Sequence, residues 1–292
     1  MSIRKFLRFI FVMALLPLAA GAQGLDATKI DSQLGRSGQK TGDVYKVGFP
    51  RTDLHVSVHG LAIKPGLALG SWAAFSGTDD HAVVMGDLVL LEDEVNPVMD
   101  KLKSAGFEIT AIHNHLADET PHVMYMHYMG HGPAAQLATS LRTALSASKT
   151  PLEKPAAAAE PPSPPAWVDA LEKKLGRKGA FKGGVLAYGI ARANQITMDG
   201  MIIAPAAGVA EAINFQAADS GNVATTGDFV LTAAEVNPVI SELRSHNIAV
   251  TAVHSHMLGE EPRLFFMHFW AVGSPEAVGA GIDAALKRVA VK

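Results

Sequence analysis

The hydrophobic and polar positions of the chain repeat with helical spacing in some stretches and with strand-like alternation in others. The clearest helical stretch covers residues 94–105 and ends before Gly106. Its apolar positions recur every three or four residues, on one face of an amphipathic helix: Val95, Val98, Met99 and Leu102. We expect Pro97 in the first turn of this helix, where a missing N–H costs little.

The rest of the first half alternates between short helices and strands. Helical spacing predicts further helices at 25–35 and 133–146, and a glycine-rich turn follows the first of them. A turn is predicted at Glu119-Thr120-Pro121. Apolar or alternating stretches between Gly, Pro and Asp predict strands at 53–63, 67–75, 81–90, 108–116 and 122–129. These elements indicate an α+β domain with a mainly antiparallel sheet of about five strands and two or three helices.

The second half of the chain repeats the first. Leu34-Gly35-Arg36 recurs 141 positions later as Leu175-Gly176-Arg177, and the helix start at 94–98 recurs at 235–239. The register slips by one only between about residues 63 and 87. Self-similarity over such a length indicates the tandem duplication of a whole domain.

A stretch rich in Ala and Pro separates the two copies. We assign residues 147–165 to an extended linker, residues 23–146 to the first copy and residues 166–292 to the second. The alternative is a single domain with a Pro-rich loop, because the copies could still pack against each other.

Composition narrows the classes of partner. The 292 residues include 25 basic and 28 acidic side chains, for a formal net charge of -3, which gives no electrostatic reason to bind nucleic acid or anionic lipid. The chain has no cysteine, which excludes disulfides, thiolate nucleophiles and cysteine-type zinc sites. Any metal must therefore be held by His, Asp or Glu.

Residues 1–22 have the pattern of a secretory signal. Basic residues precede a short apolar stretch, and Ala20-Gly21-Ala22 offers small residues for cleavage. The apolar stretch is too short for a good membrane span. We therefore expect a periplasmic or secreted protein that begins at Gln23 after cleavage near Ala22.

Paired histidines recur in both copies and form the candidate metal site. His113 and His115 lie two residues apart in a predicted strand, so both side chains project from one face. If the chain turns back at Pro121, His127 lies across from His115 and Glu119 lies at the turn. Three nitrogens and one oxygen suit zinc, with copper as the second choice. The second copy offers the matching set: His254, His256, Glu260 and His268.

Other interpretations of these residues remain open. The histidines could be structural, and a hairpin slipped by one residue would turn His127 to the opposite face. Metal-free catalysis or ligand recognition is a further alternative. The first copy carries additional histidines at positions where the second has other residues, so it is the choice if only one copy is active. Asp87 and Asp228 follow glycine, and we interpret them as turn residues in preference to acidic groups of the site.

The chain resembles a family of exported bacterial proteins named for the mycobacterial lipoproteins LppY and LpqO. The matching stretches are Leu34–Arg36, Tyr45–Val47, Gly70–Phe75, Met85–Leu90, Glu94–Val98, His113–Leu116 and Val123–His127. The resemblance implies an exported, usually duplicated domain with no established activity. Because this chain lacks the lipidated cysteine of its namesakes, the resemblance does not extend to a membrane anchor.

Two metal-site patterns are similar to parts of the chain. His113, His115 and Glu119 have the H-x-H-x3-E spacing of cupins, although the helix before their strand departs from a cupin barrel. His254-Ser255-His256 is similar to the His-Ser-His of JAMM-type metallopeptidases.

Three functions follow from these residues. The first is an exported protein that binds a divalent transition metal. The second is a metal-dependent hydrolase, in which Glu119 could act as general base, and the third is a metal-free module that binds a small ligand or a protein. A hollow beside His113 and His115 would favour the hydrolase, whereas a shell sealed by aromatic and Met side chains would favour storage or structural support. The sequence leaves open whether the two copies form one joint site.

Overall fold

The computed structural model describes residues 24–153 and 163–292. The predicted signal sequence at 1–22 and the middle of the predicted linker lie outside the described residues. Among the helices described, none is long and apolar enough to cross a membrane.

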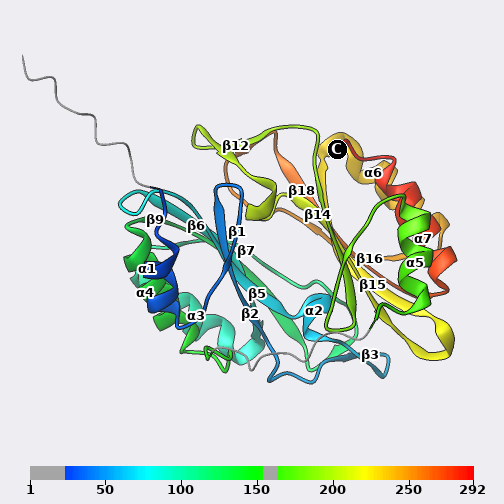
Figure 1. Cartoon of the computed structure of the whole chain (residues 1–292), viewed down its shortest axis with the longest axis horizontal. Helices are drawn as coiled ribbons and strands as arrows, with labels where there is room; N and C mark the ends of the chain where they lie inside the picture. Colours follow the sequence, from blue (N-terminus) through cyan, green and yellow to red (C-terminus); the bar gives the residue numbers. More distant parts are fainter. Residues whose placement is uncertain (1–23, 154–162) are drawn as a thin grey trace, which may run out of the picture.

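Each copy is built on one six-stranded antiparallel sheet (Figure 1). The strands of the first copy are β1 (Gln39–Thr41), β2 (Val44–Pro50), β5 (Gly70–Gly77), β6 (Ala82–Leu91), β7 (Glu108–His113) and β9 (Val123–Gly132). Those of the second copy are β10 (Ala180–Lys182), β11 (Val185–Ala191), β14 (Ala210–Ala217), β15 (Val223–Thr232), β16 (Ala249–His254) and β18 (Leu264–Gly273). The spatial order β1-β2-β5-β6-β9-β7 of the first sheet is repeated as β10-β11-β14-β15-β18-β16 in the second.

A small three-stranded sheet accompanies each large one. It consists of β3 (Ser57–Val58), β4 (Leu61–Ala62) and β8 (Glu119–Thr120) in the first copy, and of β12 (Ile196–Met198), β13 (Met201–Ile203) and β17 (Glu260–Glu261) in the second. The duplicated α+β architecture predicted from the sequence is confirmed, with six strands in each large sheet.

Helices cover the outer face of each sheet, so the two sheets face each other in the middle of the molecule (Figure 1). The first copy contributes α1 (Ala27–Leu34), α3 (Glu92–Ser104) and α4 (Ala134–Leu145), and the second α5 (Ala166–Leu175), α6 (Ala233–Ser245) and α7 (Pro275–Leu286). Successive residues of a strand point to opposite faces of the sheet. Tyr45, Val47 and Phe49 of β2 point to the outer face and pack under the helices of their own copy. Burial of these apolar faces drives the assembly of each copy.

A separate apolar cluster joins the two copies. It combines Val44, Ala74, Val83, Met85 and Met129 of the first copy with Ile196, Met198, Val209, Met257 and Phe266 of the second. Each copy also lays a short helical segment on the other's sheet: α2 (Pro65–Ala68) contacts β14 and β15, and the 3-10 helix η1 (Pro205–Ala207) contacts β2 and β5. A second short 3-10 helix, η2 (Asp219–Gly221), lies between β14 and β15.

Polar side chains secure the same contact between the copies. The Gln216 side chain accepts a hydrogen bond from the Lys64 N–H and donates one to the Ala62 carbonyl, each at 2.8 Å. The Asn214 amide donates to the Leu67 carbonyl at 3.0 Å. The two copies are therefore packed against each other, and both contribute residues to the contact.

The local predictions were wrong in the stretch before β5. The predicted strand at 53–63 contains only β3 and β4, and the true strand β2 lies in the stretch interpreted as a glycine-rich turn. The predicted strand at 67–75 begins as α2. Helix α3 begins at Glu92, two residues earlier than predicted, so Pro97 lies inside the helix and not in its first turn.

Candidate metal centre

Six histidines, three from each copy, meet between the facing sheets. His113 ends β7, His115 follows it in the connecting loop, and His127 lies in the middle of β9. In the β7–β9 pairing His113 is opposite Tyr125, which places His113 and His127 on the same face of the sheet. We call these three residues the first trio, and their counterparts His254, His256 and His268 the second trio.

The register that we predicted for this hairpin was wrong, although His127 does join the site. His127 is opposite Ala111 and not His115, because the pairing shifts between Ile109 and Ala111 and β7 ends at His113. The second copy has the same register, because Ala252 is opposite His268 in the pairing of β16 with β18.

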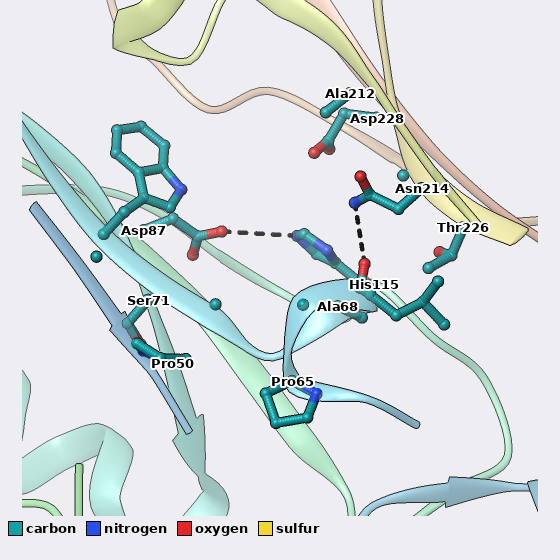
Figure 2. A pocket seen from close by; sticks show the side chains of 16 residues that line it. Pro50, Pro65, Ala68, Ser71, Asp87, His115, Ala212, Asn214, Thr226 and Asp228 are labelled. Carbon is teal, nitrogen blue, oxygen red and sulfur yellow. Dashed lines mark hydrogen bonds and ion pairs between the residues drawn. The ribbon is translucent and has the colours of Figure 1, made fainter. Parts of the chain in front are cut away.

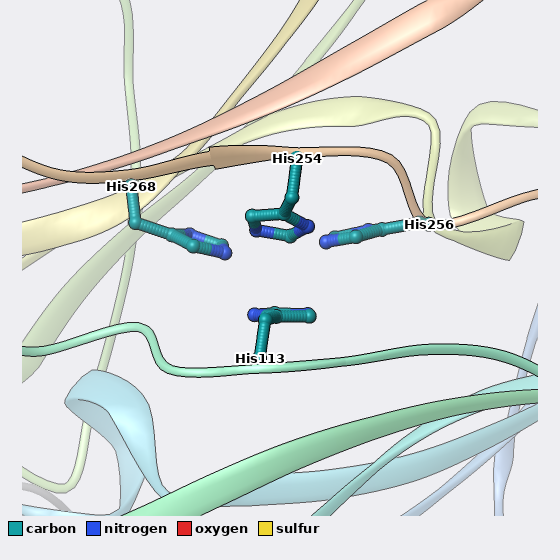
Figure 3. Close-up of side chains that lie close together, drawn as sticks. All are labelled: His113, His254, His256 and His268. Atoms are coloured by element: carbon teal, nitrogen blue, oxygen red, sulfur yellow. The ribbon is translucent and has the colours of Figure 1, made fainter.

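Each imidazole of the first trio stacks on one imidazole of the second. The ring centroids of His113 and His254 are 3.6 Å apart, those of His115 and His268 3.7 Å, and those of His127 and His256 3.6 Å. Figure 3 shows His113 of the first copy facing the second trio, with the nitrogens of all four rings converging. The structure therefore has one joint site and not two separate ones.

The Nε2 atoms of all six histidines are buried, and none has a hydrogen-bond partner among the described residues. Such orphaned polar atoms cost free energy and are uncommon in folded proteins. On the other side of the ring, Nδ1 of His113 lies 3.2 Å from the Asn114 carbonyl and Nδ1 of His268 lies 3.1 Å from the Gly227 carbonyl. A proton on Nδ1 satisfies these carbonyls and leaves the Nε2 lone pair directed into the site, as in histidines that ligate metals.

The nitrogens are close enough to share ions. The ligand atoms of the first trio all lie within 4.8 Å of one another, and so do those of His113 with the second trio. A third group under the same limit joins His115 and His268 to Asp228. Zinc lies about 2.0–2.1 Å from its histidine nitrogens, so the side chains of each group would move closer together around a bound ion.

Burial favours the neutral form of His127 and His254. Removal from water, reinforced by His268, lowers the pKa of His254 to about 4. Burial likewise lowers the pKa of His127 to about 3, although the Asp228 charge opposes the shift. At pH 7 both side chains carry a free lone pair, which is the form that binds a metal.

Two aspartates flank the histidines. Asp87 has its carboxylate oxygens 3.9 Å from Nε2 of His115 and 3.8 Å from Nε2 of His127, and Asp228 lies 2.8 Å from Nδ1 of His268. Burial and the nearby Asp228 charge raise the pKa of Asp87 well above its usual value. Burial also acts against ionisation of Asp228, but the charge of His268 and its hydrogen bond lower the pKa of Asp228.

The turn interpretation of these aspartates was wrong. Asp87 lies within β6 and pairs with His127 across the sheet, while Asp228 lies within β15 and pairs with His268. The recurrence of Gly-Asp in both copies was the signal that could have identified them.

A cavity of about 360 Å³ opens beside the histidines on one side of the joint site (Figure 2). Both copies line it, with Trp72, Asp87 and His115 from the first and Asn214, Thr226 and Asp228 from the second. A second, much smaller space of about 20 Å³ lies next to His127 and His256, between Trp72, Met85, Ala207 and Met257. The space beside His115 is therefore much larger than the space beside His127 and His256.

Glu119 and Glu260, predicted as oxygen ligands, have other contacts. Glu119 lies 2.6 Å from His122 and accepts a hydrogen bond from the Val123 N–H, at the entry to β9. Glu260 accepts one from the Leu264 N–H and pairs with Arg263. Among the described residues, neither belongs to a group of side chains close enough to share an ion.

Comparison with known proteins identifies a domain family. A family model described as Domain of Unknown Function (DUF1259) matches residues 28–147 and, a second time, residues 169–288. No curated protein matches the chain.

Similarity to solved structures is weak. The trimeric bacterial microcompartment shell protein PduB aligns with 14% identity and a TM-score of 0.21, over 87% of this chain and 89% of that one. EtuB from Clostridium kluyveri aligns with 11% identity and a TM-score of 0.20, over 86% and 88% of the two chains. These TM-scores are too low to assign a shared fold.

Proposed function

Because the chain belongs to the DUF1259 family, whose description assigns no role, we propose a function from the site itself: an exported protein that binds a divalent transition metal between its two copies. The observation that carries the proposal is the set of six buried Nε2 atoms without partners. Neutral imidazoles with two nearby carboxylates form a donor set that suits zinc, with copper as the second choice.

Export is the part of the proposal that depends on the sequence. Residues 1–22 have the pattern of a secretory signal, and the resemblance to the LppY and LpqO family supports a place in the periplasm or outside the cell. A cysteine-free site of histidines suits such an oxidising compartment, since it has no thiolate to oxidise.

The test is the metal content of the full mature chain from Gln23, purified without a histidine tag and incubated with zinc or copper. Mass spectrometry should find bound metal in the wild type and less in His127→Ala. His131→Ala is the matched control, because His131 lies on the same strand but is exposed. Circular dichroism checks that both variants fold. Absence of bound metal in the wild type would overturn the proposal.

A second candidate is a metal-dependent hydrolase, and the cavity beside His115 favours it. A bound divalent ion lowers the pKa of a coordinated water molecule and so supplies a nucleophile at neutral pH. In this chain Asp87 lines the cavity and lies near His115, where its carboxylate could hold or accept a proton. Asp87, and not Glu119, is thus the better placed general base.

Hydrolysis of p-nitrophenyl acetate and p-nitrophenyl phosphate by the zinc-loaded protein tests this candidate. We expect turnover that Asp87→Asn reduces by at least tenfold while the zinc content stays unchanged. Absence of turnover with both compounds would favour metal binding without hydrolysis of such esters.

A further inference from the structure

We propose that the joint site holds two metal ions, one in each trio, facing each other across the contact between the copies. This inference rests on the proposed function, because it specifies how many ions the same histidines bind and where.

The stacking of the rings gives the spacing between the two ions. All three pairs have nearly the same centroid separation, 3.6–3.7 Å, so the second trio is displaced from the first by one ring spacing. Ions at equivalent positions in the two trios would be separated by the same displacement. Protein sites that use two metal ions together hold them about 3.5–4 Å apart.

Each trio by itself resembles a three-histidine metal site. In the first trio the rings of His115 and His127 lie within 8° and 15° of parallel to His113, and both centroids are 5.1 Å from it. In the second trio the centroids of His256 and His268 lie 4.8 and 4.7 Å from His254. Three imidazoles around one ion leave a coordination position open.

A single ion does not account for all the orphaned nitrogens. The largest group, His113 with the second trio, would offer the ion one nitrogen from each of four histidines. It would leave the Nε2 atoms of His115 and His127 buried without partners. With one ion in each trio, the first trio binds one ion through His113, His115 and His127. The second trio binds the other.

Neighbouring aromatic rings hold the trios in place. The Tyr125 ring stacks on His115 at 3.5 Å, and the Phe266 ring stacks on His256 at 3.6 Å. These are matching positions of the two copies. Because the rings are packed from behind, the trios have little freedom to collapse onto one shared ion.

Charge balance also permits two ions. Each copy contributes one aspartate beside the histidines: Asp87 and Asp228. Bound cations favour the ionised form of both aspartates, and the two carboxylates then offset half of the four positive charges of two divalent ions. The cavity beside Asp87, His115 and Asp228 would let a small anion reach the ions and offset the remaining positive charge.

The experiment combines stoichiometry with magnetic coupling on the chelator-treated full mature chain. Zinc titration should saturate at two equivalents per chain, and His268→Ala should lose one of them while His131→Ala keeps both. In the wild type, two equivalents of Cu²⁺ should give an electron paramagnetic resonance signal well below that of two isolated ions, because ions so close couple.

The outcomes separate this inference from the proposed function. Saturation at one equivalent would overturn the two-ion centre and leave metal binding intact. Two equivalents with the full signal of isolated copper would overturn the face-to-face placement. No bound metal would overturn both. If His268→Ala fails to fold, the wild-type stoichiometry and copper signal still decide the inference.

Discussion

Lys46 is a cation that the first copy alone places between the sheets. Its Nζ lies 3.8 Å from the centre of the Trp72 ring, whereas Ala187 and Ala212 occupy the matching places of the second copy. Burial lowers the pKa of Lys46 to about 8, although the charges of Asp87 and Asp228 oppose the shift. Lys46 therefore makes the two sides of the site electrostatically different.

A pH-dependent stability difference should follow from Lys46. The unfolded chain keeps its lysine protonated up to about pH 10.5, but the folded chain releases the proton near pH 8. The unfolded state thus binds more protons in this window, and the folded state gains stability as pH rises. Relative to Lys46→Met, the wild type should gain about 2 kcal/mol in free energy of unfolding between pH 7 and pH 9.5.

Urea denaturation of the chelator-treated wild type and variant at both pH values measures this change. The difference between the two proteins cancels the titration of all groups that do not interact with Lys46. An unchanged difference would contradict the lowered pKa of Lys46.

A buried arginine connects elements at the edge of each copy. Arg51, at the end of β2, is fully buried and donates to both carboxylate oxygens of Glu94 in α3, at 2.7 and 3.2 Å. It also donates to the Val89 carbonyl at 2.7 Å. In the second copy Arg192 pairs with Glu235 in the same way.

Removing this arginine should destabilise the chain. Arg51→Met leaves the Glu94 carboxylate buried without its partner, which we expect to lower the free energy of unfolding by about 3–5 kcal/mol in urea denaturation. The double variant Arg51→Met/Glu94→Gln removes the unpaired charge as well and should recover part of the loss. A double variant as unstable as the sum of its single variants would contradict the pairing.

Glycine in β15 allows two strands to approach closely beside the metal centre. A Cβ at Gly227 would overlap the Ala212 carbonyl oxygen of β14, and Gly227 directly precedes Asp228. We expect Gly227→Ala to force β14 and β15 apart, with a loss of about 1–3 kcal/mol in stability and weaker zinc binding. Urea denaturation and zinc titration measure both effects.

Gly189→Ala is the control for this substitution. Gly189 lies in β11, and a Cβ there meets nothing within 4 Å. It should therefore change stability little and leave zinc binding unchanged. Equal effects of the two substitutions would show that strand propensity, and not the close approach, is responsible.

The elements that the sequence predicted well are those with an uninterrupted pattern. Helices α3 and α4 and strands β6 and β9 show clear periodicity and were found close to their predicted positions. Strand β2 was missed because Gly48 interrupts its alternation, and glycines on both sides suggested a turn. Asp87 was assigned to a turn for the same reason, since a glycine precedes it.

The histidines were predictable, but their joint arrangement was not. The repeated H-x-H pattern and its counterpart in β9 are local signals that need no knowledge of the fold. The stacking of His113 on His254 depends on how two distant sheets pack. No local periodicity encodes that contact, because it arises from the apolar cluster between the copies and from the crossing of α2 and η1. The predicted turn also drew attention to Glu119, whose side chain instead binds the start of β9.

At the scale of the whole molecule, the metal centre is a link between two otherwise separate cores. Each copy has its own buried cluster under its helices, and the histidines lie within the contact that joins them. A metal that binds both trios binds only the folded, packed pair of copies. Its binding free energy therefore adds to the stability of the complete molecule.

Metal removal should lower the thermal stability of the full chain. Free zinc at about one hundred times its dissociation constant adds about 2.7 kcal/mol to the free energy of unfolding. For a chain of this size, that corresponds to an increase of roughly 5–10 °C in Tm. Because the ions connect the copies, we also expect calorimetry to show a single transition with zinc and a broader or divided one after chelation. His131→Ala should keep the zinc-dependent increase and His127→Ala should lose most of it, whereas equal Tm values with and without zinc would show that the metal does not hold the copies together.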